Sequence, residues 1–590
     1  MSLALFTLIT TEEGLRDACL RLGREQVIGL DTETTSLNPL RGRLRLIQLA
    51  GSSGVFVVDA DRLGGAKPDS PSFAHLRRLL SAPTPLKIAH NSKFDIKWIR
   101  QRLGIDVSSI FDTMLAAQLL DFDGRHSLRA LADQYLQTRV DKTLQSSDWS
   151  RELSQPQLEY AAKDAEILLP LQQVLADQLR SEGLEQVASL EFEAVGEIAR
   201  LELGGIAVDR ERFEDLILTI EARRDALAQE LLALLEPGIP QLPLFSDAPS
   251  SLNLDSSLQL ADAFERIGVR LPASTRAGYL APLAEEHEPV RLLLDYREMQ
   301  KLASSFGRNI LDTIDRNTGR LHAHYRQIGT MTGRVTCEKP NLQQLPADGD
   351  LRSVFRAPEG RVMVTADYST FELRILAEAS GDRAMTKAFL DGRDLHRETA
   401  AMVFKCSPDA VTIPMRHVGK HLNLGVVYGL GARGLARKTG QTEAEAQATL
   451  DRFFRFHPEL KNWMNRMARM ALEINSVRTL SGRLVRFGFD PNNKEVVAYI
   501  KRLARNAPAQ GTAADILKRA MVILGPRLEA KNARVVNIIH DEILVEAPET
   551  DAEEVAALTS ASMKEAGREF LPNVPVEVTP SIASYWHKGP

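Results

Sequence analysis

The feature that most constrains the fold is a pair of adjacent carboxylates inside an apolar segment near the C-terminus. Residues 535–548 read VVNIIHDEILVEAP, so Asp541 and Glu542 interrupt a run of β-branched and other apolar side chains. This composition predicts a strand or a hairpin. An unpaired carboxylate is costly to bury, so the pair needs a partner, either an arginine or a metal ion.

A second apolar strand ends at a carboxylate and offers such a partner. Residues 362–380 read VMVTADYSTFELRILAEAS, in which Asp367 ends the strand and Glu372 follows as a helix begins. Aspartates from two strands can clamp two magnesium ions, which prefer oxygen ligands and complete their octahedra with substrate phosphates. A buried arginine remains the competing partner for Asp541.

A predicted helix between these strands carries an unusual stripe. In MRHVGKHLNLGVVYG, residues 415–429, four residues recur every four positions and share one face: Arg416, Lys420, Leu424 and Tyr428. Two cations, an apolar side chain and an aromatic one suit a triphosphate, a sugar and a base; the alternative is a charged helix face. His417 and His421 are also four apart, but they lack the third histidine or glutamate of a zinc site.

The N-terminal third carries four more carboxylates. Asp31 and Glu33 in GLDTETTSL are two apart on a predicted strand, so both point to one face. Asp95 starts a helical pattern, and Tyr160 and Asp164 are four apart on another predicted helix. Carboxylates that converge from three elements are what a two-metal site requires, whereas each one alone is typical of a surface acid or a helix cap.

Length and composition set the class of protein. At 590 residues the chain exceeds one core and predicts roughly three to five domains. Its 44% hydrophobic and 26% charged residues are typical of a soluble globular protein. Three scattered cysteines argue against disulfides and favour a reducing compartment. We expect neither a secretion signal nor a membrane span, because no basic leader and no apolar run of about 18 residues occurs.

The net charge of −5 is only weak evidence against nucleic acid, because local basic patches bind phosphate. One stretch, residues 500–520, is locally basic through Arg502, Arg505, Lys518 and Arg519. These residues either contact DNA phosphates or form a solvated helix face.

The motifs, in this order, resemble two known families. The set Asp31, Glu33, Asp95, Tyr160 and Asp164 resembles the 3′–5′ exonuclease domain of the DEDD superfamily, in its tyrosine variant. DYSTFELR, RxxxKxxxxxxxYG and HDE resemble motifs A, B and C of family A DNA polymerases. MTGRVTCEKPNLQQLP, RNAPAQGTAADILKRAM and SSLNLDSSLQLADAF resemble this family's TGR segment, minor-groove-reading segment and thumb tip. The resemblance covers essentially the whole chain and is to the large fragment of the bacterial enzymes, without their 5′-nuclease.

The resemblance implies a multidomain α/β and α+β fold, with a ribonuclease H-like exonuclease domain before a right-hand polymerase. The exonuclease domain would be residues 1–190 and the polymerase 191–590. Within the polymerase the thumb would span about 191–325, the palm about 326–385 and 490–590, and the fingers about 386–489. The implied function is template-directed addition of dNTPs to a primer 3′ end by a two-metal mechanism, with 3′–5′ proofreading, in replication or repair. The alternative is a 3′–5′ exonuclease whose polymerase-like half only binds DNA.

The resemblance also implies roles for matching residues in the polymerase half. Asp367, Asp541 and the backbone carbonyl of Tyr368 would hold the metals, with Glu542 as a nearby supporting carboxylate. Arg416 and Lys420 would grip the triphosphate, and Lys420 could protonate the leaving pyrophosphate. Glu372 would block a ribose 2′-hydroxyl. The other implied dNTP contacts are His396, Leu424 and Tyr428, of which Tyr428 would pack near the templating base. The implied DNA contacts are Arg334, Asn506, Gln510, His540 and Arg502.

In the exonuclease domain, the implied metal ligands are Asp31, Glu33, Asp95 and Asp164. Tyr160 would orient the attacking water, and Asn91 would support the site. Implied cofactors are two Mg²⁺ ions in each active site, for which Mn²⁺ can substitute. Implied partners are primer-template DNA and dNTPs, with no membrane, for a monomer in the cytoplasm of a bacterium or of a phage host.

Two positions depart from the family's pattern. Motif B usually carries phenylalanine or tyrosine where this chain has Leu424, and motif A usually carries glutamine where it has Thr370. The metal ligands and the triphosphate contacts are unaffected, so the departures concern sugar discrimination and fidelity.

Overall fold

The computed structural model describes residues 6–139, 144, 147–235, 252–272, 274–346 and 350–587. The stretch 237–257, whose many proline and serine residues predict a loop, lies mostly outside these residues. The chain divides into two compact units: the first comprises Met1–Gly205, Ala323–Gln344 and Glu359–Pro590, and the second comprises Ile206–His322 and Leu345–Pro358. Among the helices of the described residues, none is both long and apolar enough to cross a membrane.

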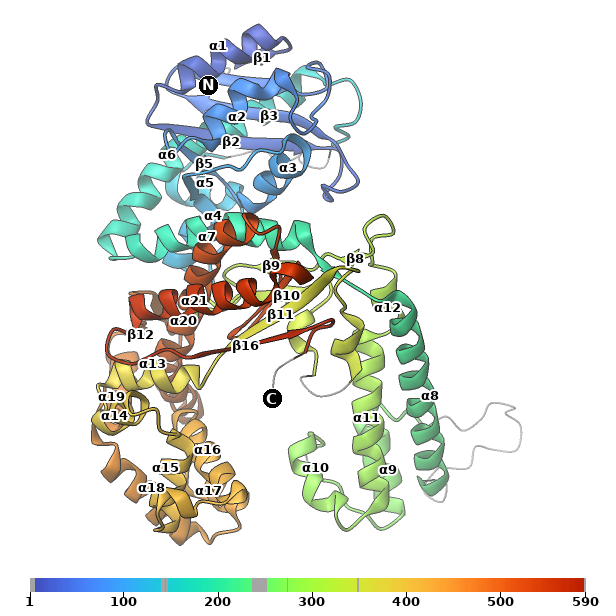
Figure 1. The fold of residues 1–590 in the computed structure, drawn as a ribbon, viewed down its shortest axis with the longest axis vertical. Helices are drawn as coiled ribbons and strands as arrows, with labels where there is room; N and C mark the ends of the chain where they lie inside the picture. The colour runs from blue at the N-terminus through green and yellow to red at the C-terminus, as the bar shows by residue number, and fades with distance from the viewer. Residues whose placement is uncertain are drawn as a thin grey trace. The chain divides into compact units, whose positions relative to one another are not determined.

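The N-terminal part of the first unit is a mixed six-stranded sheet with helices, drawn in blue in Figure 1. Its strands in spatial order are β1 (Phe6–Ile9), β4 (Gly54–Asp59), β3 (Leu44–Gly51), β2 (Val27–Thr34), β5 (Leu86–Ala89) and β6 (Ile110–Asp112). Strand β2 is central, because it pairs antiparallel with β3 and parallel with β5. The predicted α/β alternation is confirmed here.

Seven helices accompany this sheet. They are α1 (Glu12–Leu22), α2 (Ala74–Ser81), α3 (Lys93–Leu103), α4 (Thr113–Leu120), α5 (Leu128–Leu136), α6 (Gln155–Ser181) and α7 (Glu185–Gly204). Helix α6 starts at a capping box formed by Ser154 and Gln157, which satisfies the free N–H groups of its first turn. It packs directly on β2 and β3, and its buried face joins the core of the sheet.

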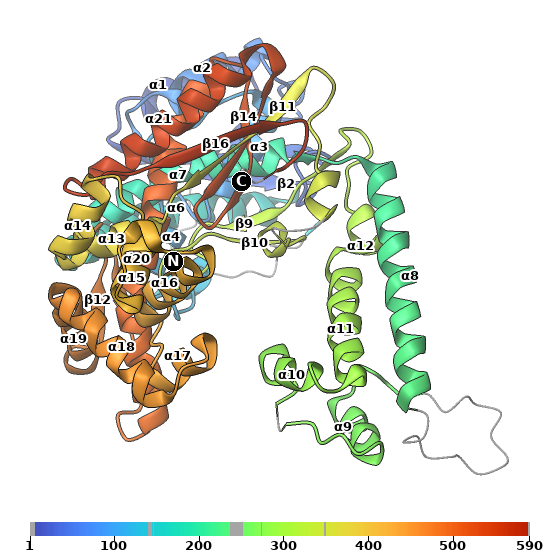
Figure 2. The same cartoon turned by 60° about the horizontal axis from the view of Figure 1, so that its bottom comes forward.

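A second sheet of the first unit holds the C-terminal hairpin. Its antiparallel strands in spatial order are β14 (Arg534–Ile539), β15 (Glu542–Pro548), β11 (Arg361–Tyr368) and β16 (Val578–Ala583). The predicted hairpin is confirmed, with only two residues, 540 and 541, between β14 and β15. Helices α20 (Lys494–Glu529) and α21 (Ala552–Phe570) pack side by side against this region (Figures 1 and 2).

A helical region lies between β11 and α20, in yellow and orange in Figure 2. It contains α13 (Phe371–Ser380), α14 (Arg383–Leu390), α15 (Leu395–Phe404), α16 (Ile413–Val427), α17 (Ala432–Thr439), α18 (Glu443–Phe456) and α19 (Pro458–Glu473). A short hairpin of β12 (Ser476–Arg478) and β13 (Leu484–Arg486) follows, and another of β9 (His324–Arg326) and β10 (Thr336–Glu338) precedes β11. The helical region predicted at about 380–475 is confirmed.

The second unit is mainly helical. It contains β7 (Ile206–Ala207), α8 (Arg210–Leu235), α9 (Ser257–Arg266), α10 (Ala277–Ala284), α11 (Glu288–Phe306), α12 (Arg308–Leu311) and β8 (Arg320–Leu321). Helices α8 and α11 lie side by side, and Leu231, Phe264 and Leu293 are buried in the core that they share with α9 and α10 (Figure 2).

Candidate active sites

Three of the predicted exonuclease ligands come together. Carboxylate oxygens of Asp31, Glu33 and Asp164 all lie within 4.8 Å of one another. The first two stand on one face of β2, and the third projects from α6. Helix α6 can approach β2 this closely because residue 29 is glycine: a Cβ there would lie 2.3 Å from the carbonyl oxygen of Ala165. Three oxygen donors this close suit a divalent cation.

Asp95 lies next to this group but faces a different partner. It is buried in the first turn of α3 and accepts a hydrogen bond of 2.6 Å from the hydroxyl of Thr32, between Asp31 and Glu33 on β2. Burial raises the pKa of Asp95 to about 7, although the Thr32 hydrogen bond acts to lower it. The Asp95 carboxylate is therefore held against Thr32 on β2, and it is not one of the three grouped carboxylates.

Tyr160 stands beside the same carboxylates. Burial raises the pKa of its hydroxyl, and the neighbouring charge of Asp164 and a hydrogen bond with that residue raise it further. The phenol therefore stays protonated and keeps a donor directed at the carboxylates. Asn91 has a left-handed backbone with φ of 55°, and its N–H donates to buried Asp112 over 3.2 Å. Asn91 thus shapes the turn before α3.

Sequence reasoning missed Leu37, which lies four residues after Glu33. Its side chain is 86% exposed on the segment that follows β2. An exposed leucine alone needs no explanation, but this one lies on the segment that follows the strand of Asp31 and Glu33. The signal available in the sequence was an apolar residue within the otherwise polar segment TTSLNP.

The polymerase carboxylates meet at one end of the second sheet. Asp367 on β11 lies directly opposite Glu542 on β15, and the N–H of Tyr368 donates to the Asp541 carbonyl over 3.2 Å. The two-residue turn that carries Asp541 is therefore anchored beside the end of β11. His540 completes the turn, with φ of 52° and an exposed side chain.

Glu542 and Tyr368 are fixed by their own buried contacts. The Glu542 carboxylate accepts a hydrogen bond of 2.8 Å from the indole N–H of fully buried Trp586. The Tyr368 hydroxyl donates to the Met563 carbonyl over 2.8 Å, and its ring stacks on Phe371 with centroids 4.0 Å apart. Tyr368 can therefore offer a ligand only through its backbone, and Glu542 supports the turn.

One carboxylate joins three predicted site residues. Glu372 accepts a hydrogen bond of 2.7 Å from Arg334 and another of 2.6 Å from the Tyr428 hydroxyl. Burial and the charge of Glu372 raise the pKa of Tyr428 to about 12. A cavity of about 260 Å³ opens beside this bridge, and its lining includes Arg334, Glu372, His540 and Asp541. The structure thus gathers these residues around one hollow.

The cationic stripe lies on α16 as predicted, with Tyr428 immediately after the last turn. Arg416 pairs with Asp394 over 2.5 Å, and Asp394 caps α15. The ammonium of Lys420 is exposed. His396 is buried and its Nδ1 lies 3.1 Å from the Asn423 amide.

The pKa of His396 is lowered to about 4, mainly by burial; the charge of Asp394 acts to raise it, and those of Arg416 and Lys420 act to lower it. The ring is therefore neutral at physiological pH. A neutral imidazole can still offer one N–H to a phosphate.

The predicted DNA contacts on α20 differ in burial. Arg502 is exposed near Tyr499, whereas Asn506 is buried, and its side-chain oxygen has no hydrogen-bond partner within the described structure. Buried polar atoms without a partner are rare, so this oxygen is a candidate for ligand binding. Gln510 lies within hydrogen-bond reach of Tyr428.

Both interpretations offered for Lys518 are wrong. It neither forms a solvated face nor can reach DNA phosphates, because its side chain is fully buried and pairs with Glu191 over 2.5 Å. Arg519 is paired with Glu569 over 2.8 Å. The helix periodicity did not show this, because each partner comes from a distant part of the chain.

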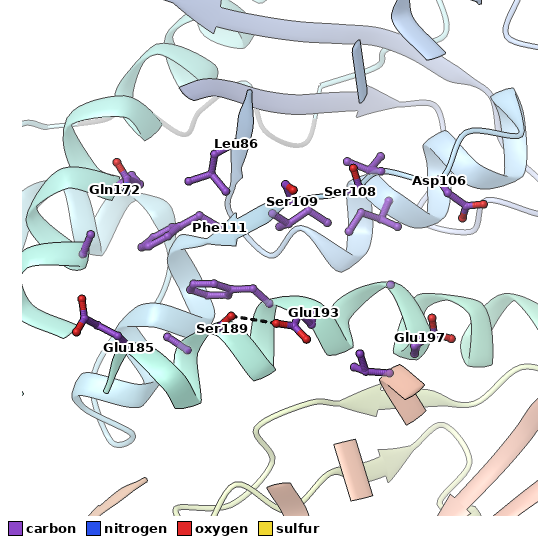
Figure 3. A pocket seen from close by; sticks show the side chains of 18 of the residues that line it. Leu86, Asp106, Ser108, Ser109, Phe111, Gln172, Glu185, Ser189, Glu193 and Glu197 are labelled. Atoms are coloured by element: carbon purple, nitrogen blue, oxygen red, sulfur yellow. Dashed lines mark hydrogen bonds between the residues drawn. The ribbon is translucent and has the colours of Figure 1, made fainter. Parts of the chain in front are cut away.

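A cavity of about 670 Å³ lies elsewhere, between the β5–β6 edge of the first sheet, α6, α7 and α20. Figure 3 shows Phe111 on its wall, and the acidic side chains of Glu185, Glu193 and Glu197 along α7. None of the predicted site residues lines it. Volume alone therefore does not identify the chemical sites of this protein.

The two carboxylate sites, the cationic helix and the order of their motifs define the class. The chain belongs to DNA polymerase family A, which its residues 241–588 match, and it carries a 3′–5′ exonuclease domain, matched by residues 6–180. The predicted fold class is confirmed, and the polymerase interpretation is supported over the non-catalytic alternative.

The chain is similar to DNA polymerase I of several bacteria. It is 34% identical to that of Aquifex aeolicus (strain VF5), over 99% of this chain and 100% of the relative. It is 33% identical to that of Pseudomonas aeruginosa, over 97% of this chain and 65% of the relative's length. A solved structure, the POL domain of Pol1 from M. smegmatis in complex with DNA primer-template and dNTP, matches 99% of both chains, with 25% identity and a TM-score of 0.83.

Proposed function

We propose that this chain extends a DNA primer on a template with dNTPs and removes mispaired 3′ ends at a second, separate site. The observation that carries the proposal is the meeting of Asp367 and Asp541 at one end of the second sheet, beside the hollow that Arg334 and Glu372 line. We propose that residues 1–190 form the exonuclease domain, about 191–325 the thumb and about 386–489 the fingers.

In the polymerase site, Asp367, Asp541 and the backbone carbonyl of Tyr368 would hold two divalent cations. These residues fit such ions because they offer only oxygen donors. We propose Mg²⁺, for which Mn²⁺ can substitute. When bound, the cations supply Lewis acidity at the primer 3′-hydroxyl and at the α-phosphate. The buried Glu542–Trp586 contact keeps the Asp541 turn in place.

The incoming dNTP would lie along α16. Arg416 would exchange its Asp394 contact for a phosphate, and His396 would donate one N–H to the same group. Lys420 would hold a proton at Nζ for the leaving pyrophosphate. Leu424 would touch the sugar, and Tyr428 would pack near the templating base.

The primer terminus would lie over Arg334, Asn506, Gln510 and His540, with Arg502 at a DNA phosphate. Every Watson–Crick pair presents acceptors in the minor groove, at purine N3 and pyrimidine O2. Donors placed there can test the geometry of a pair without reading its sequence. The amide NH₂ of Asn506 can donate in this role, whereas the unpaired side-chain oxygen of Asn506 can only accept.

In the exonuclease site, Asp31, Glu33 and Asp164 would hold the cations directly. The grouping of their oxygens within 4.8 Å supports this. Asp95, held by Thr32, would be a further ligand. Tyr160 would orient the attacking water, and Asn91 would shape the turn beside it.

Primer extension with Mg²⁺ and dNTPs tests the proposal. We expect the purified chain to extend a recessed 3′ end to the length of its template and to trim a single strand. Trimming without extension would support the alternative of a non-catalytic DNA-binding half. We propose that the chain acts as a monomer in the bacterial cytoplasm, since the similar proteins are bacterial.

Replacing Glu372 by alanine should weaken discrimination against ribonucleotides. The carboxylate lies where the β11 strand passes into α13 and is held there by Arg334 and Tyr428. We expect kcat/KM for an rNTP, relative to the matching dNTP, to rise roughly tenfold or more. A binding pocket typically discriminates against one added hydroxyl by about a hundredfold. Glu372→Gln, which preserves side-chain size, is the control and should change the ratio less. An unchanged ratio in Glu372→Ala would remove this residue from sugar selection.

Replacing Leu424 by tyrosine should narrow discrimination against dideoxynucleotides. Leucine offers apolar contact but no hydroxyl to replace a missing 3′-OH, so a polar neighbour is left unpaired at a cost of about 1–3 kcal/mol. We therefore expect the native protein to prefer dNTP over ddNTP by roughly ten- to a hundredfold. The measurement is kcat/KM for each nucleotide, with the exonuclease disabled by Asp31→Ala. Leu424→Phe should leave the ratio as it is; equal ratios in native and Leu424→Tyr proteins would place the sugar elsewhere.

A further inference from the structure

Four charged side chains meet inside the first unit, close to the segment that carries Arg334. They are Glu191 on α7, Arg483 in the β12–β13 turn, and Asp515 and Lys518 on α20, and all four are buried. Two are acidic and two are basic, so the cluster is neutral as a whole. Burying four charges is expensive, and their arrangement therefore calls for an explanation.

The cluster is closely connected by hydrogen bonds. Lys518 donates to the Glu191 carboxylate over 2.5 Å, and Arg483 donates to Asp515 over 2.5 Å as well as to Glu191. Burial acts to raise the pKa of Glu191, but the charges of Lys518 and Arg483 hold it below its usual value. The Glu191 carboxylate is therefore ionised at physiological pH, and it faces two basic side chains.

The cluster also holds one peptide of the segment before β10. The Lys518 ammonium donates to the carbonyl of Gly333 over 2.8 Å. On the other side, the guanidinium of Arg483 packs so closely that a Cβ on Gly333 would lie 2.5 Å from its Cζ. Gly333 has φ of 81°, which L side chains rarely adopt. The peptide that precedes Arg334 is thus fixed from two sides.

Arg334, the next residue, reaches out of this anchored peptide to Glu372 over 2.7 Å and lines the hollow beside Asp541. We propose that Lys518 and Arg483 are positioning residues, which fix the Gly333 peptide so that Arg334 stands ready at the primer terminus. Neither side chain touches substrate. The inference rests on the proposed polymerase function and on the assignment of Arg334 to the primer terminus.

The test is a double-mutant cycle between Lys518→Met and Arg334→Ala, read as the rate of single-nucleotide addition to a primer-template with Mg²⁺. We expect the rate of nucleotide addition to fall roughly ten- to a hundredfold in each single variant, because each one removes a hydrogen bond to a charged group. If Lys518 acts through Arg334, the double variant should be about as slow as Arg334→Ala alone. Arg527→Met is the matched control on α20, because Arg527 pairs with Glu565 over 2.8 Å and should leave the rate unchanged.

A second readout separates positioning from loss of folding. Trimming of single-stranded DNA uses the other site and should persist in Lys518→Met at the native rate. If Lys518→Met does not fold, the double variant Glu191→Gln with Lys518→Met takes its place. This charge-balanced variant removes the hydrogen bond from Lys518 to the Gly333 carbonyl and leaves no net charge in the cluster.

If the rate losses of the two single variants multiply in the double variant, Lys518 and Arg334 act independently and the proposal is overturned. Loss of trimming in the single and the charge-balanced variant alike would also overturn it, because the cluster would then hold the fold instead of Arg334. Failure of the native protein itself to extend a primer would count against the proposed function, and the cycle would then have no rate to resolve.

Discussion

Asp541→Asn is expected to abolish primer extension while single-strand trimming continues. Asp541 sits in the two-residue turn between β14 and β15, anchored to Tyr368 beside the end of β11. Asparagine keeps the size of the side chain but removes the charge that a divalent cation needs. Charge stabilisation by bound metal is worth several kcal/mol, so extension should fall roughly a thousandfold or more.

The measurement is extension of a labelled primer beside trimming of a labelled single strand, with the same preparation of protein. Asp551→Asn, just beyond the far end of β15, is the control and should extend normally. Extension at a tenth of the native rate or better in Asp541→Asn would mean that this carboxylate is not a metal ligand.

The double change Asp31→Ala with Glu33→Ala is expected to produce the reverse phenotype. Both carboxylates project from one face of β2 toward Asp164, so the change removes two of the three carboxylates grouped there. Trimming should fall roughly a thousandfold or more for the same electrostatic reason. Extension should stay within about twofold of native, because no ligand is shared with the second sheet.

Glu12→Ala with Glu13→Ala on α1 is the control, because it removes two acidic side chains of the same domain away from the group. The rate of single-strand trimming in this control should equal that of the native protein. Loss of extension together with trimming in the Asp31 and Glu33 variant, in a protein that is still folded, would contradict the assignment of two separate sites.

Sequence reasoning predicted those parts of the fold in which local pattern and tertiary structure agree. The apolar runs around Asp367 and Asp541 became β11 and the β14–β15 hairpin, because short runs of β-branched and other apolar residues favour buried strands. The four-residue spacing of the cationic stripe likewise became one face of α16. Motif order then indicated the family, which the comparisons confirm.

The rest of the fold and of the sites depended on tertiary contacts, which the spacing of residues along the sequence does not show. Lys518 looked like a surface cation, because its charge partner Glu191 lies far away in the sequence and comes from another helix. The bridge from Glu372 to both Arg334 and Tyr428 was equally hidden, although each residue had been singled out. The hydrogen bond from Thr32 to Asp95 was hidden as well, because the two residues are 63 positions apart in the sequence.

The central claim is that one chain holds two independent metal-dependent sites acting on the same primer end. Conversion of a dNTP into its monophosphate at a paired primer terminus tests this most directly, because it requires addition and then removal. We predict that the native protein forms dNMP steadily with Mg²⁺, that Asp541→Asn alone and the Asp31 and Glu33 variant alone form almost none, and that mixing the two variants restores it. Steady dNMP formation by either variant alone, or none from the mixture while each keeps its remaining activity, would contradict the account.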